Sequence, residues 1–187
     1  LAGGFGTRIA EANGPKPMVK IGNKPILYHI MKYYEKFGYK DFIVALGYKG
    51  NFIKKKFKKY NFQVKFVDTG LNTMTGGRVK RLKKYLRNER FMLTYGDGLS
   101  NVNLNNLLKH HIKSKKIATV TAVRPPARFG EIKIKSNKVS EFKEKARSKS
   151  QWINGGFFIF EPEFINYIKN DQTSLESEPL TKLSKKG

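Results

Sequence analysis

The sequence predicts an α/β fold with a mostly parallel, mixed sheet and helices on both faces. Short apolar runs such as 42–46 and 91–95 are continuous, as expected for strands buried on both faces. They alternate with longer segments of helical period such as 25–37, and such alternation favours parallel strands. With 187 residues, of which 39% are hydrophobic, the chain is predicted to form one domain, 1–187.

Each element follows from a local pattern. The helix over 25–37 starts at a proline and repeats apolar residues at Ile26, Ile30 and Tyr34. A basic helix is expected over 51–60, with Phe52, Ile53 and Phe57 facing inward. The patterns predict further strands at 64–67, 91–95 and 117–123, and further helices at 77–86 and 104–112.

The pattern changes after the two prolines at 125–126. Strict alternation over 131–135 indicates a half-exposed antiparallel strand, and 138–145 is expected to be a second, looser strand. The run 157–160 is predicted to be a buried strand, and a helix is expected over 162–168.

Composition restricts the class of protein. The net charge of +24 comes from 38 Lys and Arg against 14 Asp and Glu, and the cations are spread along the chain. Nucleic-acid recognition motifs do not accompany them, so we interpret the charge as a solvated surface without a nucleic-acid partner. The sequence has no apolar run long enough to cross a membrane and no Cys, which fits a cytoplasmic protein.

Phosphate-binding chemistry is indicated by two segments near the start. Residues 1–8 read Leu-Ala-Gly-Gly-Phe-Gly-Thr-Arg, and Lys16 lies between two prolines. Glycines let backbone N–H groups approach phosphate oxygens, and Arg8 and Lys16 supply positive charge. Such a loop normally follows a strand, and residues 183–187 read like the end of a helix with more chain to come, so we expect a fragment truncated at both ends.

A metal ligand is predicted at Asp97, between two glycines just past the strand 91–95. Ligands of open parallel sheets bind outside the carboxyl ends of the strands, and a carboxylate there can hold Mg²⁺. An ordinary Asp-Gly turn is the alternative. The phosphate-binding segments favour the metal.

Two other segments allow more than one interpretation. The glycine pair at 76–77 is either a connection into a helix or backbone close to a nucleobase, with Thr73, Thr75 and Arg78 donating hydrogen bonds. Glu144 and Lys145 with Asn154 could bind a sugar phosphate. They could equally be a solvated charge pair and a turn.

These motifs together resemble the sugar-1-phosphate nucleotidylyltransferase family. The likeness covers essentially all 187 residues and rests on four segments, 1–8, 15–18, 95–98 and 152–156. It implies a Rossmann-like fold of the nucleotide-diphospho-sugar transferase type. It further implies a nucleotide-binding half over 1–124 and an incomplete sugar-phosphate-binding half over 125–187.

The segments 68–78 and 121–130 narrow the resemblance to members that transfer a cytidylyl group from CTP to glucose 1-phosphate. The implied products are CDP-glucose and pyrophosphate, formed by Mg²⁺-assisted in-line attack in nucleotide-sugar and lipopolysaccharide O-antigen biosynthesis. A homo-oligomer is implied. The alternatives are a member using dTTP, UTP, GTP or another sugar, a non-catalytic nucleotide-binding regulatory relative, and a basic nucleic-acid-binding module.

The resemblance also implies roles for single residues. Nucleotide contacts are implied for Leu1, Ala2, Gly3, Gly4, Gly6, Thr7, Arg8, Lys16, Thr73, Arg78 and Gly96. Sugar-phosphate contacts are implied for Gly130, Glu144, Lys145 and Asn154. Arg8, Lys16 and Asp97 are the implied catalytic groups, with Asp97 as the metal ligand and a second Asp ligand expected beyond Gly187.

Overall fold

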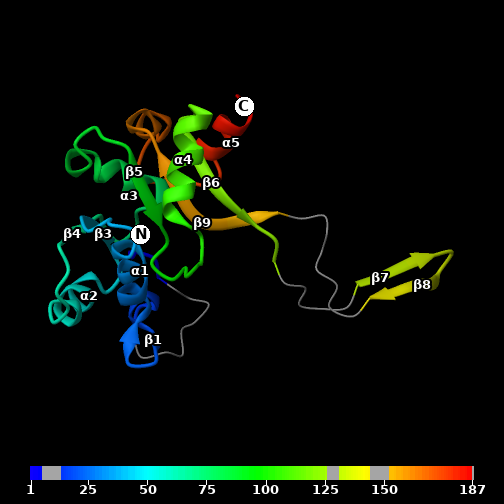
Figure 1. Cartoon of the computed structure of the whole chain (residues 1–187), viewed down its shortest axis with the longest axis horizontal. Helices are drawn as coiled ribbons and strands as arrows, with labels where there is room; N and C mark the ends of the chain where they lie inside the picture. Colours follow the sequence, from blue (N-terminus) through cyan, green and yellow to red (C-terminus); the bar gives the residue numbers. More distant parts are fainter. Residues whose placement is uncertain (6–13, 126–130, 144–151, 187) are drawn as a thin grey trace.

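The computed structural model describes residues 1–5, 14–125, 131–143 and 152–186. It has the predicted α/β architecture, with the main strands packed among helices and one hairpin standing apart from them (Figure 1).

The main strands run in one succession from β4 to β6. β3 (Phe42–Leu46) pairs in parallel with β4 (Val64–Asp68). On the other side of β3, residues 1–2 bridge to β5 (Phe91–Thr94). The Ala2 amide donates to the Ala45 carbonyl at 2.9 Å, and the Leu1 nitrogen donates to the Thr94 carbonyl at 2.7 Å. The start of the chain therefore lies between β3 and β5.

β9 (Ile153–Phe160) runs against the general direction. It lies between β5 and β6 (Ala118–Val123) and is antiparallel to both. β5 and β6 are consequently parallel to each other, and the sheet is mixed but mostly parallel, as predicted. Ile153 pairs with Val123, so the chain leaves the sheet after β6 and re-enters it at a neighbouring position.

The helices follow the apolar periodicity, with shifted ends. α1 (Ile26–Glu35) starts after Pro25 and buries Leu27, Ile30, Met31 and Tyr34. α2 (Gly50–Phe57) ends three residues before the predicted limit, and it buries Ile53 and Phe57 as predicted but leaves Phe52, also predicted to face inward, 38% exposed. The predicted helix over 77–86 is divided into α3 (Thr75–Arg81) and a 3-10 turn, η3 (Lys83–Tyr85). α4 (Leu104–Ser114) is capped by Asn103, whose side chain accepts from the Asn106 amide at 2.9 Å.

Several short elements were not expected. A two-residue hairpin, β1 (Lys20–Ile21) and β2 (Lys24–Pro25), precedes α1. Two 3-10 turns are η2 (Lys16–Met18) and η4 (Pro162–Tyr167), the latter where a helix was predicted. A last helix, α5 (Pro179–Ser184), ends within residues 183–187, where the sequence predicted the end of a helix.

The hairpin apart from the main sheet is formed by β7 (Glu131–Lys135) and β8 (Lys138–Lys143), as the alternation predicted. β8 ends at Lys143, and residues 144–145 of the predicted strand lie outside the described residues. Apolar side chains of this hairpin are exposed, with Ile134 71% and Phe142 60% accessible.

The core is apolar and rich in Phe. Phe157, Phe158 and Phe160 of β9 are at most 2% exposed, because β9 is covered by α4 and α1 on one side and by the 162–175 segment on the other. A second cluster packs α1 and α2 against β3. Within the described residues, none of the helices is long and apolar enough to span a lipid bilayer.

Candidate functional site

The predicted phosphate-binding lysine and the predicted metal ligand are neighbours. Lys16 Nζ lies 3.4 Å from Asp97 Oδ2, although 81 residues separate them. Asp97 follows the carboxyl end of β5, and Lys16 begins the 3-10 turn η2 between Pro15 and Pro17. Both side chains keep part of their surface in water, 17% for Lys16 and 40% for Asp97. The pair is therefore accessible to a ligand.

Gly96 makes this approach possible. Its amide donates to the Leu1 carbonyl at 2.7 Å. A Cβ atom on Gly96 would lie 2.7 Å from that carbonyl oxygen and 3.0 Å from Pro17 Cγ. Since neither the Leu1 carbonyl nor the Pro17 ring can move away cheaply, a side chain here would separate the turn holding Asp97 from the segment holding Lys16.

The start of the glycine-rich loop is held by Arg78, whose residue is 4% exposed. Its Nη1 donates to Leu46 O, Thr69 Oγ1 and Gly70 O at 2.7–3.0 Å, and its Nη2 donates to Gly3 O at 2.9 Å and Leu71 O at 3.2 Å. Burial lowers the pKa of the guanidinium from its ordinary value. Backbone carbonyl dipoles compensate this buried charge.

The position of the Arg78 guanidinium also explains why residue 3 is a glycine. A Cβ atom on Gly3 would lie 2.3 Å from Arg78 Nη1, whereas one on Gly4 would meet open space. Gly3 is thus fixed against the protein and Gly4 is exposed. Arg78 was predicted to contact the nucleotide; its guanidinium instead bonds backbone carbonyls and Thr69, and a nucleotide contact of Arg78 stays a prediction.

The glycine pair of α3 packs against a segment far along the chain. A Cβ atom on Gly77 would lie 2.4 Å from Asp171 O, and one on Gly76 would lie 2.7 Å from Thr173 O. Of the two interpretations left open by the sequence, the geometry supports a packed connection into a helix for these two glycines. Thr73, just before them, is 7% exposed.

Asn154 connects to the site through Tyr95, which precedes Gly96. Asn154 Nδ2 donates to the Tyr95 hydroxyl at 3.4 Å, and that hydroxyl donates to Glu176. Sequence reasoning missed both Tyr95 and Glu176. Tyr95 had a signal, its position beside the predicted metal ligand. Glu176 had none, because the residues that link it to the site, Tyr95 and Thr75, lie 81 and 101 residues away.

The described residues thus bring together the predicted Leu1, Ala2, Gly3, Gly4, Lys16, Thr73, Arg78, Gly96, Asp97 and Asn154 around the carboxyl ends of β3 and β5. Six predicted site residues lie outside the described residues: Gly6, Thr7, Arg8, Gly130, Glu144 and Lys145.

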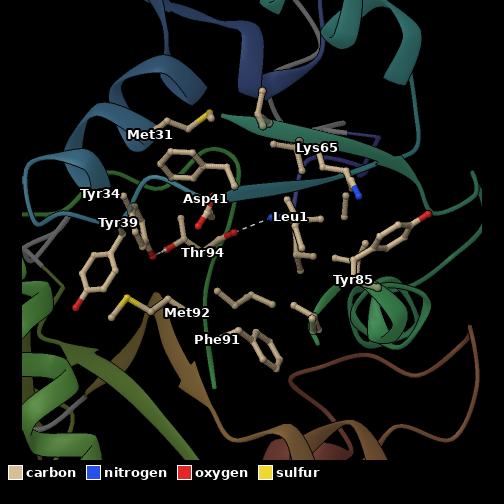
Figure 2. A pocket seen from close by; sticks show the side chains of 18 of the residues that line it. Leu1, Met31, Tyr34, Tyr39, Asp41, Lys65, Tyr85, Phe91, Met92 and Thr94 are labelled. Carbon is tan, nitrogen blue, oxygen red and sulfur yellow. Dashed lines mark hydrogen bonds between the residues drawn. The ribbon is translucent and has the colours of Figure 1, made fainter. Parts of the chain in front are cut away.

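A large cavity of about 1150 Å³ lies between β3 and β5 and borders the candidate site, since Leu1, Ala2 and Gly96 line part of it. Figure 2 shows Met31 and Tyr34 on one side, Phe91 and Met92 on another, and Leu1 hydrogen-bonded to Thr94 across it. Its lining is mainly apolar and includes neither Lys16 nor Asp97. Four cations, Lys65, Lys84, Arg87 and Arg90, are also among its lining residues, while the predicted phosphate-binding lysine and metal ligand lie outside it.

Metal-binding groups are sparse in the part of the chain that the structure describes. It contains no group of three or more His, Cys, Asp or Glu side chains placed to hold an ion. Asp97 is a single, partly exposed carboxylate beside Lys16. A cation here would need ligands from other sources.

Comparison with known proteins agrees with this arrangement. The family model described as nucleotidyl transferase matches residues 1–184. The glucose-1-phosphate cytidylyltransferase of Salmonella typhimurium is 42% identical, over all of this chain and 83% of its own length. The probable glucose-1-phosphate cytidylyltransferase of Bacillus subtilis is 39% identical, over all of this chain and 84% of its own. The crystal structure of HddC from Yersinia pseudotuberculosis superposes with a TM-score of 0.76 at 30% identity, over 97% of this chain and 84% of that one.

Proposed function

The chain belongs to the nucleotidyl transferase family, and on that premise we propose that it transfers a cytidylyl group from CTP to glucose 1-phosphate. The products are CDP-glucose and pyrophosphate. The names of the 39–42% identical relatives support the choice of both substrates. The CDP-glucose would serve nucleotide-sugar biosynthesis, including that of lipopolysaccharide O-antigen.

The observation that carries the proposal is the 3.4 Å approach of Lys16 to Asp97 beside the glycine-rich loop. Nucleotidyl transfer joins two anions, so the site needs a cation for the reacting phosphates and a carboxylate for a metal ion. A lysine and an aspartate at the carboxyl end of β5 supply one of each at a single position.

The nucleotide lies, in this proposal, along residues 1–8. The backbone of Leu1, Ala2, Gly3 and Gly4 faces the cytosine and ribose, and Gly6, Thr7 and Arg8 hold the triphosphate. Arg78 acts through its bond to the Gly3 carbonyl, 2.9 Å long. Thr73 and Gly96 complete the border of this region.

Mg²⁺ suits the residues present. It binds proteins through one or two carboxylates and otherwise takes substrate phosphates and water, so a single exposed Asp97 can contribute a ligand. When bound, the ion would neutralise phosphate charge and align the reacting groups. A second Asp ligand, outside residues 1–187, is part of the proposal.

The reaction needs positioning more than covalent help. A phosphate oxygen of glucose 1-phosphate attacks the α-phosphorus of CTP, and the bond from that phosphorus to the bridging oxygen of pyrophosphate breaks. Lys16 and Arg8 reduce the repulsion between the two anions and hold them in line. Gly130, Glu144, Lys145 and Asn154 would bind the sugar phosphate.

A guanylyl transfer is the second candidate. The D-glycero-alpha-D-manno-heptose 1-phosphate guanylyltransferase of Campylobacter jejuni is 32% identical over 89% of this chain. HddC from Yersinia pseudotuberculosis, which this chain resembles in structure, was also crystallised in complex with GMP-PN. The nucleobase of the triphosphate that gives the fastest turnover distinguishes cytidylyl transfer from guanylyl transfer.

The test is pyrophosphate release by the full-length protein, with glucose 1-phosphate and each of CTP, UTP, dTTP and GTP. The proposal expects CTP to be used best and turnover to stop when a chelator removes Mg²⁺. Equal or faster turnover with dTTP or GTP would overturn the cytidylyl assignment. Turnover with none of the four would favour the non-catalytic, nucleotide-binding alternative.

We further propose a cytoplasmic homo-oligomer that uses neither nucleic acid nor a membrane as partner. If the net charge of +24 serves only to keep the surface solvated, duplex DNA should bind weakly and be released steeply as salt rises. Tight, sequence-selective DNA binding at physiological salt would contradict this proposal.

A further inference from the structure

One carboxylate, Glu176, contacts both sides of the candidate site. It lies in the segment between η4 and α5, outside every predicted motif. Its Oε1 accepts from the Tyr95 hydroxyl, and its Oε2 accepts from the Thr75 hydroxyl at 2.8 Å and the Ser174 hydroxyl at 2.6 Å. Three hydroxyl groups from three separate segments therefore converge on it.

The partners of Glu176 are unusual for this chain. The sequence carries 38 Lys and Arg, yet within the described residues none of them forms an ion pair with Glu176. A carboxylate held by directed hydroxyl donors has a more fixed orientation than one beside a flexible ammonium group. The hydroxyl donors also keep the Glu176 pKa below its ordinary value despite partial burial, so the group accepts from all three.

Tyr95 carries the contact toward the sugar-phosphate side. Its hydroxyl accepts from Asn154 Nδ2 at 3.4 Å, while Asn154 Oδ1 accepts from the Gly156 amide at 2.8 Å. Gly156 leaves room for the ring, since a Cβ atom there would lie 2.9 Å from Tyr95 Cδ2. Both ends of the Asn154 amide are thus occupied, and its orientation is set through Tyr95.

Thr75 carries the contact toward the nucleotide side. It is the first residue of α3, and its hydroxyl also accepts from the Leu175 amide at 2.9 Å. The same helix presents Arg78, which binds the Gly3 carbonyl. Glu176 therefore fixes the start of the helix that orders the glycine-rich loop.

We propose that Glu176 is a positioning residue that, through Tyr95 and Thr75, aligns the sugar-phosphate side of the site with its nucleotide side. The inference rests on the proposed function for the identity of the two substrates. Glu176 touches neither substrate in this scheme, and its effect appears in how well each substrate is held.

Steady-state kinetics of Tyr95→Phe and Glu176→Gln test the inference. Tyr95→Phe keeps the ring and breaks the link to Asn154, so KM for glucose 1-phosphate should rise about tenfold, as the loss of one directed hydrogen bond implies. KM for CTP should change by less than about twofold in that variant. Glu176→Gln should raise both KM values, because it also weakens the link to Thr75.

A double-mutant cycle separates positioning from general loosening. If Glu176 acts on Asn154 through Tyr95, the variant that carries both substitutions should have the same KM for glucose 1-phosphate as Tyr95→Phe alone. Glu178→Gln is the matched control, since it is the same substitution two residues away on a carboxylate that pairs with Lys169 at 3.3 Å. That control should leave both KM values unchanged.

Effects of the two substitutions that multiply in the double variant would overturn the inference. An equal rise in the Glu178→Gln control, or a lower Tm with unchanged KM values, would also overturn it. If the wild-type protein instead uses another triphosphate or sugar 1-phosphate, the proposed substrates fail. The same variants, assayed with the substrates that work, then still decide the role of Glu176.

Discussion

The surroundings of Arg78 and the β7–β8 hairpin are stabilised in opposite ways. Arg78 is buried and its guanidinium bonds five oxygen atoms from separate segments. In the hairpin, the described apolar side chains of Ile132, Ile134, Val139 and Phe142 are all more than half exposed. Backbone pairing between its two strands is the interaction that defines it.

This difference indicates that the nucleotide side of the site is closely packed in the absence of a ligand, whereas the hairpin is not. On the nucleotide side, a Cβ atom at Gly3 or Gly96 would lie within 3 Å of side-chain or backbone atoms, so residues 1–4 and 96 are closely packed without a ligand. The hairpin is part of the proposed sugar-phosphate half and contributes little apolar burial. Mutations should therefore be felt strongly around Arg78 and weakly in the hairpin.

Removal of the guanidinium is expected to have the largest effect. Arg78→Ala removes all five hydrogen bonds of the guanidinium together with its buried packing, and should lower the free energy of unfolding by about 3–5 kcal/mol. Urea denaturation followed by circular dichroism measures this.

The neighbouring arginine of α3 provides the control. Arg81 is 45% exposed and pairs with Asp171, so Arg81→Ala should cost no more than about 1 kcal/mol. Equal unfolding midpoints for the two variants would show that Arg78 does not hold the loop.

Loss of charge at the reacting phosphates comes next. Lys16→Ala should lower kcat by about 10²–10³-fold, and Asp97→Asn should weaken Mg²⁺ dependence and nearly abolish turnover. Both proteins should keep their circular dichroism spectra, because neither residue belongs to the core. Wild-type rates at limiting Mg²⁺ would place the chemistry elsewhere.

A methyl group on the helix surface tests the packing between α3 and the 171–175 segment. Gly77→Ala would bring Cβ within 2.5 Å of Asp171 Cα, and should destabilise the protein by about 1–3 kcal/mol despite the better helix propensity of Ala. Gly98→Ala, whose nearest contact would be 4.0 Å away, should leave stability nearly unchanged. A neutral or stabilising Gly77→Ala would refute the close packing.

The smallest effect is expected in the hairpin. Ile134→Thr and Phe142→Thr expose no new apolar surface and should change the free energy of unfolding by less than about 0.5 kcal/mol. Thermal unfolding of both variants checks this. A loss above about 1.5 kcal/mol would mean that these side chains are buried in solution, and the contrast with Arg78 would disappear.

The sequence predicted the main strands and helices because their signals are local. Apolar period predicted α1 and α4, and continuous runs predicted β3 and β5. The direction of β9 could not be predicted, because a strand buried on both faces has the same composition whichever way it runs. The 3-10 geometry of η4 was also missed, since its apolar spacing over a few residues matches that of an α-helix.

Site residues were predictable from the sequence where their type and local motif indicate a binding role. The approach of Lys16 to Asp97 is the outcome that the phosphate and metal motifs would produce. Arg78 was singled out, but its binding to carbonyls depends on loops at 3 and 70–71 that local patterns do not place. Glu176 could not be predicted as a site residue for the same reason, because only the fold brings Tyr95 and Thr75 close to it.

The pairing of Val123 with Ile153 has a consequence for how members of this fold can diversify. The chain leaves the sheet after Val123 and returns to it at Ile153, so the connection over 124–152 starts and ends at neighbouring ladder positions. Such an insertion can be lengthened, shortened or exchanged while the strands that flank it keep their hydrogen bonds. The 124–152 connection is therefore a segment that evolution or engineering can exchange as a unit. Such an exchange could change the preference for the sugar phosphate and leave the nucleotide-binding strands unchanged.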